Sequence, residues 1–140
     1  MHARNTLRNA IISKLKSANI SGVGNNVFGS RSRKLWTGDL PAILVYTRTE
    51  DSKAPQLSSP LLQRTLKIGI EARATAGDDL EDVLDSLAEG IESAVAADET
   101  FGLEFVSSAS LVETGVDLNE ETQRPIGGIR LTYEVRYLTE

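Results

Sequence analysis

Residues 62–97 read LQRTLKIGIEARATAGDDLEDVLDSLAEGIESAVAA, and this stretch decides the fold. Apolar and polar side chains alternate from residue 62 to 75, apart from Arg64, which predicts a strand with one buried face. Apolar side chains then recur every three or four positions from residue 79 to 97, which predicts an amphipathic helix with Asp78 as its N-cap. The stretch therefore predicts a helix that packs on one face of a sheet.

The remaining elements follow from the same two periodicities. An amphipathic helix is expected over residues 3–18 and a short strand over residues 26–28. A proline turn precedes a buried strand over residues 42–48, another strand is expected around residues 105–116, and clean alternation closes the chain over residues 129–137. These elements predict an α+β fold built as a two-layer sandwich. Its mixed, mostly antiparallel sheet has four to five strands, and the two amphipathic helices pack on one face.

The length and composition predict one soluble domain. The chain has 140 residues, of which 40% are hydrophobic and 25% charged, so a single domain over residues 1–140 is expected. Residues 50–60 carry two prolines and no periodicity, which predicts a mobile loop. There is no cysteine, which excludes disulfides and thiolate metal sites. The longest apolar run, residues 42–46, is too short to span a membrane, and no targeting segment is expected.

The sequence offers no arrangement of residues that is typical of catalysis. His2 is the only histidine, so the usual triads and zinc sites are excluded. Asp82, Asp85 and Glu89 share one side of the predicted second helix. Clustered carboxylates can hold a hard cation, but they need burial or further ligands to do so. A solvated helix face is the favoured interpretation, and we expect neither an enzyme nor a cofactor or metal site.

The charges are unevenly distributed along the chain. The net charge is −5, yet residues 1–38 contain seven basic and no acidic side chains. Arg31, Arg33 and Lys34 form a cluster beside Trp36, which is favoured as a core or interface anchor. A basic segment of this kind also allows an alternative function, a small nucleic-acid-associated binding domain, although the acidic average argues against a dedicated one.

The order and spacing of these elements are similar to one known family. The resemblance rests on the stripe of Leu7, Ile11 and Leu15, on DLPAILVY at 39–46, on LKIGIE at 66–71, on the helix over 79–92 and on RLTYEVRY at 130–137. This pattern resembles the phage minor tail protein U family, the lambda-type tail terminators, over nearly the whole chain. The resemblance implies an α/β fold without catalytic residues. It further implies a hexameric ring that caps the tail tube, ends its polymerisation and joins the head.

Two segments are the expected interfaces of such a ring. In a head-to-tail ring each subunit presents different surfaces to its two neighbours, so the basic segment with Arg31, Arg33, Lys34 and Trp36 is predicted to approach the acidic helix of the next subunit. The excursion with Asp51, Lys53 and Gln56 is predicted to order against a neighbour or the tube. The expected partners are further copies of the chain, the tail tube protein and the head–tail connector or neck protein, with no specific nucleic-acid readout and no membrane. The expected location is the virion tail, reached through the cytoplasm of the bacterial host.

Overall fold

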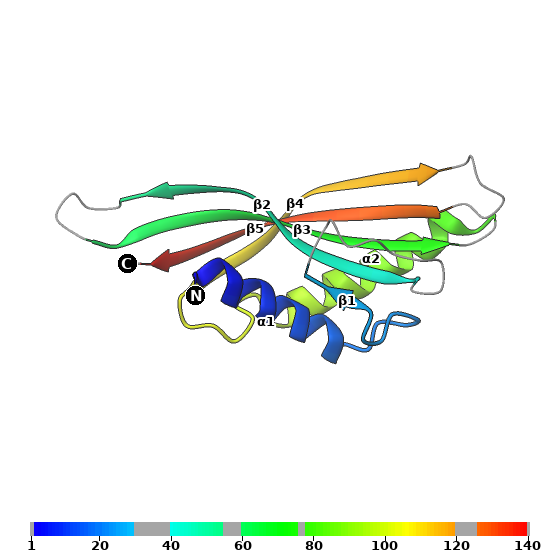
Figure 1. The fold of residues 1–140 in the computed structure, drawn as a ribbon, viewed down its shortest axis with the longest axis horizontal. Coiled ribbons are helices and arrows are strands. Elements are labelled where there is room, and N and C mark those ends of the chain that lie inside the picture. The colour runs from blue at the N-terminus through cyan, green and yellow to red at the C-terminus, as the bar shows by residue number, and fades with distance from the viewer. Residues whose placement is uncertain (1, 30–39, 55–59, 76–77, 120–125, 140) are drawn as a thin grey trace.

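The computed structural model describes residues 2–29, 40–54, 60–75, 78–119 and 126–139. The elements follow one another as two helices and five strands (Figure 1): α1 (Ala3–Ser17), β1 (Val27–Phe28), β2 (Ala42–Lys53), β3 (Leu62–Thr75), α2 (Leu80–Ala97), β4 (Val106–Asn119) and β5 (Ile126–Thr139). The predicted fold class, an α+β fold of one mixed sheet and two helices, is confirmed.

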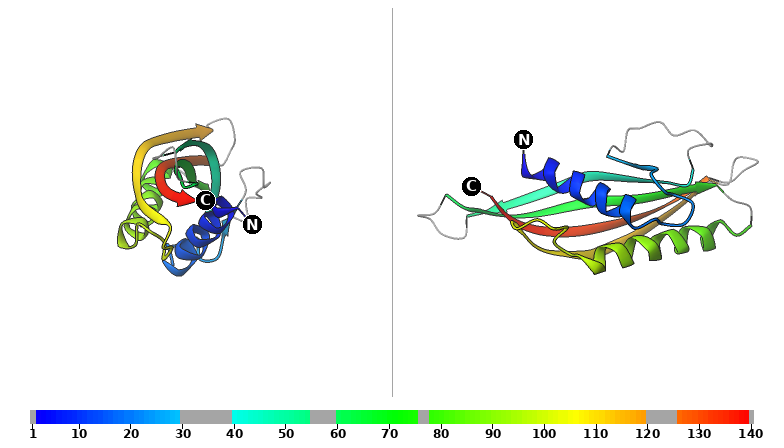
Figure 2. Two further views of the ribbon diagram at one scale, coloured as in Figure 1. Left: turned by 90° about the vertical axis from the view of Figure 1, so that its left-hand side faces the viewer. Right: turned by 90° about the horizontal axis from the view of Figure 1, so that it is seen from below.

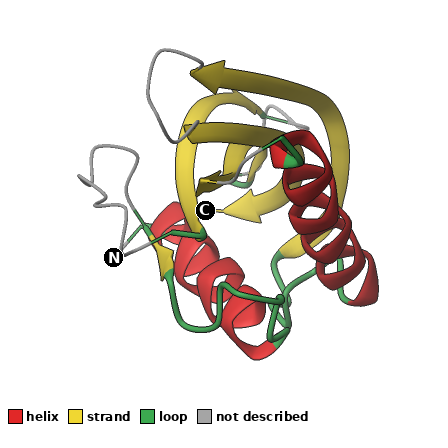
Figure 3. Ribbon diagram, turned by 90° about the vertical axis from the view of Figure 1, so that its right-hand side faces the viewer, coloured by secondary structure: helices red, strands yellow, loops and turns green. Residues whose placement is uncertain are grey.

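The sheet has the strand order β1-β2-β3-β5-β4. β1 is parallel to β2, and every other neighbouring pair is antiparallel. Two long hairpins, β2–β3 and β4–β5, extend toward opposite ends of the molecule (Figure 1). End-on views show that the sheet is strongly coiled and that both helices lie on the same face of it (Figures 2 and 3).

The hydrophobic core lies between the helices and this face of the sheet. α1 contributes Leu7, Ile11 and Leu15, the stripe read from the sequence. The inward positions of β3 and β5 alternate as expected, and α2 packs against these two central strands. The deepest members of the cluster include Ile43, Leu66, Ile68, Ile70, Leu84, Ile91, Leu131, Val135 and Tyr137.

On the other face of the sheet, Gly69 makes room for the ring of Tyr46. The two residues are register partners on β3 and β2. A Cβ atom placed on Gly69 would lie 2.7 Å from the ring of Tyr46, so only glycine leaves the tyrosine this position.

Two local predictions were wrong. Residues Glu50–Lys53 belong to β2 and pair with β3, so this part of the expected loop is strand. The backbone ladder with β3 orders them, although the side chains of Asp51, Ser52 and Lys53 are solvent-exposed, which is why no apolar alternation marks them. Residues 55–59, including Gln56, lie outside the described residues. The N-cap of α2 is Asp79 rather than Asp78, and no side chain caps that end of the helix.

Candidate functional site

The described residues contain no cluster of side chains suited to a metal ion. His2, the only histidine, is the N-cap of α1, and its Nδ1 accepts a hydrogen bond from the backbone N–H of Arg4 at 3.0 Å. Its imidazole therefore caps the helix, a role that the sequence reading missed because histidine is an uncommon cap. No helix in the described ranges is long and apolar enough to cross a membrane.

The acidic face of α2 is exposed, as the sequence predicted. Asp82, Asp85 and Glu89 all lie in solvent, and none of them forms an ion pair with a described residue. On the flank of the same helix, Glu92 lies toward β5. Burial, and secondarily the Glu92 carboxylate, raise the pKa of Tyr133 to about 12.

The basic side chains of α1 are mostly engaged within the chain. Arg4 pairs with Glu50, and Lys14 pairs with Asp98 at 3.4 Å. Arg8 donates a hydrogen bond to the hydroxyl of Thr47 at 2.9 Å. These residues contribute to packing α1 onto the sheet, which the sequence reading did not foresee. Of the other predicted interface residues, Arg31, Arg33, Lys34 and Trp36 lie outside the described residues.

A polar cluster around Glu50 closes one end of the core, beneath the start of α1. Glu50 accepts hydrogen bonds from the hydroxyl of Tyr137, from Arg4 and from Arg64 at 3.1 Å, and its own side chain is 10% exposed. Burial alone would raise the pKa of Glu50, but the hydrogen bonds from Tyr137, Arg4 and Arg64 outweigh it and hold the pKa below the ordinary 4.5. Burial and the nearby Glu50 carboxylate raise the pKa of Tyr137.

This cluster explains the one exception in the alternation of β3. Arg64 faces the same side as Leu66 and Ile68, where an apolar residue was expected. Its guanidinium also donates to the hydroxyl of Thr139 at 2.6 Å, so it ties β2, β3 and β5 together. The sequence shows Arg64 as a charge at an inward position, but it does not show which residues are its partners.

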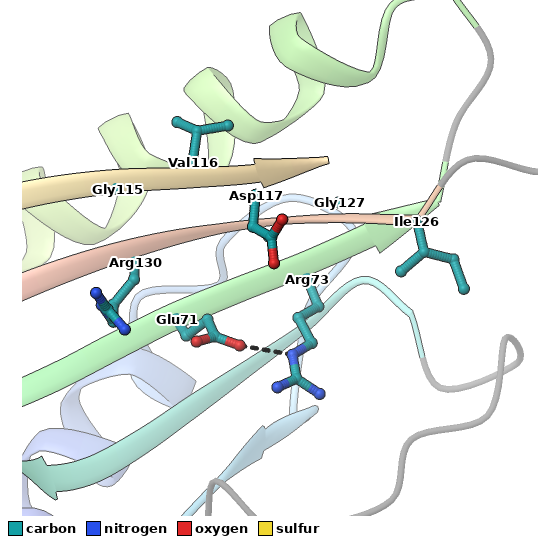
Figure 4. A pocket seen from close by; sticks show the side chains of 9 residues that line it. Glu71, Arg73, Gly115, Val116, Asp117, Ile126, Gly127 and Arg130 are labelled. Atoms are coloured by element: carbon teal, nitrogen blue, oxygen red, sulfur yellow. Dashed lines mark hydrogen bonds and ion pairs between the residues drawn. The ribbon is translucent and has the colours of Figure 1, made fainter. Parts of the chain in front are cut away.

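A hollow of about 440 Å³ lies on the face of the sheet opposite the helices, and its lining side chains are drawn in Figure 4. Glu71, Arg73, Asp117 and Arg130 supply its charges. Arg73 donates to Glu71 at 2.6 Å and Arg130 pairs with Glu113 at 3.7 Å, so acids and bases are balanced.

The same face carries a second hollow at the opposite end of the sheet. Asp51 and Lys53 line it, together with Gln63, Thr65, Lys67, Glu134 and Arg136, and its volume is about 410 Å³. Two of the predicted interface residues, Asp51 and Lys53, therefore lie on an exposed polar surface at the edge of the β2–β3 hairpin.

The outer half of β4 is the most exposed part of the sheet. Within residues 110–117 only Gly115 is partly buried. Leu111, Val112 and Val116 are 38%, 49% and 52% exposed. α2 packs on β3 and β5 and leaves this part of β4 uncovered. Alternation in the sequence predicts a strand here but does not reveal whether a helix covers it.

Both the sequence and the fold of this chain are similar to those of known proteins. The sequence matches the model of a family described as phage minor tail protein U over residues 2–137. No curated protein matches the sequence. Among solved structures, a chain described as "Virion of native gene transfer agent (GTA) particle" has a similar fold, with a TM-score of 0.58 and 14% identity. That match covers 99% of this chain and 100% of the other. The predicted resemblance is confirmed by the family match, and the structural likeness at this identity shows the fold.

Proposed function

Because this chain belongs to the phage minor tail protein U family, a family of phage tail proteins, we propose that it is the subunit of a tail terminator. In this proposal copies of the chain assemble into a ring, with six as the expected number. The ring caps the tail tube, ends its polymerisation and offers a surface to the head–tail connector or neck protein. The protein then resides in the virion tail and reaches it from the cytoplasm of the bacterial host.

The observation that carries the proposal is the family match, which extends over residues 2–137 and so over nearly the whole chain. The described surface supports it. Its most prominent features are an exposed acidic helix face, two polar hollows on the sheet and an uncovered strand. Features of this kind recognise other macromolecular surfaces through charge and shape.

We further propose that Arg31, Arg33, Lys34 and Trp36 of one subunit meet the acidic face of α2 in the next. Two observations support this pairing. Arg4, Arg8 and Lys14 are occupied within the chain, so the cluster and Lys16 hold the remaining basic side chains of the N-terminal segment. Asp82, Asp85 and Glu89 are exposed and have no cationic partner among the described residues. The hairpin residues Asp51, Lys53 and Gln56 are proposed to contact a neighbour or the tube.

Assembly is the direct test of the terminator proposal. Purified protein is studied by light scattering across a range of concentrations and by negative-stain microscopy, alone and with tail tubes of the matching phage. The expected result is a ring, and tubes that stop growing when it is added. A chain that stays monomeric even with tubes, or that leaves their growth unchanged, contradicts the proposal. Salt-sensitive binding to duplex DNA without any ring would support the nucleic-acid-associated alternative instead.

The charge pairing is tested separately. Reversing the acidic face with Asp85→Lys and Glu89→Lys is expected to weaken ring formation most at low salt, where surface charges are least screened. The matched control is Glu99→Lys with Glu104→Lys, which changes the net charge equally at exposed positions outside α2. Equal behaviour of the two double variants would contradict the proposed role of the α2 face.

A further inference from the structure

The two edges of the sheet differ from each other and are both partly open. β4 forms one edge along its whole length. At the other edge, β1 pairs only with Ile43 and Leu44 of β2, so residues 47–53 of β2 have β3 as their only partner strand among the described residues. An open edge presents unpaired backbone N–H and C=O groups that can accept another strand.

The open part of β4 lacks most of the devices that keep edge strands apart. Its fourteen residues include no lysine, arginine or proline. Its protection is limited to two bulges and to two acidic residues, Glu113 and Asp117. Leu111, Val112 and Val116 are exposed between and beside these acids. Lysine and proline are the usual means by which monomeric proteins protect such an edge.

We propose that the β4 edge of one copy pairs with the β2 edge of a second copy, so that the sheet continues from subunit to subunit; this inference rests on the proposed ring. The direction of the strands favours the pairing. β2 and β4 run in opposite directions within the sheet, because three antiparallel pairings separate them. A second copy in the same orientation therefore presents its β2 antiparallel to β4, the more common arrangement of neighbouring strands.

The charges select this partner over a symmetric β4–β4 contact. In a twofold contact centred near Gly115, Glu113 would face Asp117 of the other copy, and like charges directly opposite each other destabilise a sheet. The open part of β2 instead carries Arg48 and Lys53, together with two acids: Glu50, which is already paired with Arg4 and Arg64, and Asp51, which would lie opposite the uncharged Gly115. An antiparallel register with Glu113 opposite Lys53 also sets Asp117 opposite Thr49, next to Arg48.

The faces of the strands agree with this register. Arg48 donates a hydrogen bond to Thr132, which faces away from the helices between the inward residues Leu131 and Tyr133. Glu113 is the register partner of Thr132 and so lies on this same outer face. The acids of one copy and the bases of the next therefore project from the same side of the continued sheet.

The offset that this register requires is compatible with a closed ring. Within one copy Glu113 lies level with Tyr46, and Lys53 is six ladder positions farther along β2, about 20 Å at about 3.3 Å per residue. The four strands from the β2 edge to the β4 edge, at about 4.8 Å each, make the repeat roughly 19 Å wide, so the strands would be inclined by about 46°, close to the upper end of the roughly 35–45° of closed barrels.

The absence of cysteine allows a clean cross-linking test of this contact. In the proposed register Ser52 lies opposite Thr114 of the neighbour, and both side chains are exposed. Within one copy β3 and β5 separate their strands by about 14 Å or more, beyond the roughly 7 Å that a disulfide spans. A chain with Ser52→Cys and Thr114→Cys is assembled, then treated with a mild oxidant or a short bismaleimide. The expected product is a ladder of covalent oligomers up to the full ring on a non-reducing gel.

The single variants are the controls, and each outcome decides something. Neither Ser52→Cys nor Thr114→Cys alone should give covalent oligomers. Dimers from Thr114→Cys alone would show a β4–β4 contact and overturn the proposal. Rings visible by microscopy that give no ladder with either reagent would overturn the edge pairing and leave the terminator function intact. Failure to associate even with tail tubes would overturn both.

A charge exchange tests the same contact without cysteine. Glu113→Lys also removes the ion pair with Arg130 within the chain and is expected to weaken association roughly two- to fivefold per interface. Adding Lys53→Glu in the same chain should restore association, because the pair between copies is then reversed rather than removed. If Lys53→Glu worsens association further, the two residues are not paired and the proposed register is wrong.

Discussion

Replacing Glu50 with glutamine removes one negative charge from the centre of the polar cluster and changes almost nothing in shape. The carboxylate accepts hydrogen bonds from Tyr137, Arg4 and Arg64. Glutamine keeps one acceptor oxygen but turns an NH₂ group toward two guanidinium groups. Arg64, whose side chain is only 16% exposed, then loses its charged partner. The variant Glu50→Gln should therefore destabilise the fold.

The size of the effect follows from the exposure of each partner. A hydrogen bond between charged groups contributes about 1.5–3 kcal/mol when it is shielded from water. The Arg4 side chain is 34% exposed, so its share is closer to that of a surface ion pair, at most about 1 kcal/mol. We expect a total loss of about 2–3 kcal/mol in the free energy of unfolding. For a chain of this length that corresponds to a fall of roughly 7–10 °C in the melting temperature.

The direction of the pKa shift predicts how the stability lost in Glu50→Gln changes with pH. The pKa of Glu50 is lowered by folding. Its contribution is therefore complete above the unfolded-state pKa, near 4.5, and is lost as the pH falls through the lower folded-state pKa. Urea unfolding of the wild type and of Glu50→Gln should differ by the full amount at pH 7 and progressively less below pH 4.5.

Two controls make the result interpretable. Glu134→Gln removes the partner of Arg136, whose side chain is 58% exposed, and should cost less than about 0.5 kcal/mol. Tyr137→Phe combined with Glu50→Gln should cost less than the sum of the single variants, because both changes remove the same hydrogen bond. A loss below about 0.5 kcal/mol for Glu50→Gln at pH 7, or a loss that persists unchanged at pH 3, would refute the reasoning.

Three further predictions concern other parts of the molecule. Gly69→Ala should lower stability by about 1–3 kcal/mol in thermal unfolding, because its Cβ would strike the Tyr46 ring, whereas Gly115→Ala, with no atom closer than 4.0 Å, should be nearly neutral. His2→Ala should cost roughly 0.5–1 kcal/mol by removing the α1 cap, and an unchanged melting curve would contradict that role. Val112→Lys should leave the melting temperature of the isolated chain within about 2 °C but lower the oligomer fraction in light scattering; unimpaired assembly would count against an interface at β4.

The sequence predicted the parts of the fold whose pattern is imposed by burial. β3, β5 and α2 each present one face to the core, and their periodicities gave their positions to within a few residues. The end of β2 is ordered by backbone pairing while the side chains of Asp51, Ser52 and Lys53 stay in water, so no apolar alternation identified this part of the strand. β4 was expected around residues 105–116 and extends to Asn119. The positions of strands that a helix covers can be predicted from the sequence, whereas the uncovered ends of hairpins are much harder to predict.

The candidate surfaces also differ in how far the sequence alone could predict them. The acidic face of α2 could be predicted, since Asp82, Asp85 and Glu89 share a helix face that the core does not use. The cluster at Glu50 could not, because its members come from α1, β2, β3 and β5 and only folding brings them together. Arg64 at an inward position was the single trace of it. A charge that interrupts an apolar alternation predicts a buried partner, without saying which residue that partner is.

The exposed apolar residues on β4 and the stabilised hairpin at the other edge both favour association between copies of the chain. A monomer gains nothing from leaving Leu111, Val112 and Val116 in water on an unprotected edge, since one lysine there would reduce the risk of uncontrolled pairing at little cost to the fold. The Glu50 cluster, meanwhile, holds the free stretch of β2 rigid against α1 and β3, which lowers the entropy lost when that edge receives another strand. A ready acceptor at one edge and a weakly protected strand at the other form two different, complementary surfaces. Head-to-tail association requires surfaces of that kind, and a twofold dimer does not.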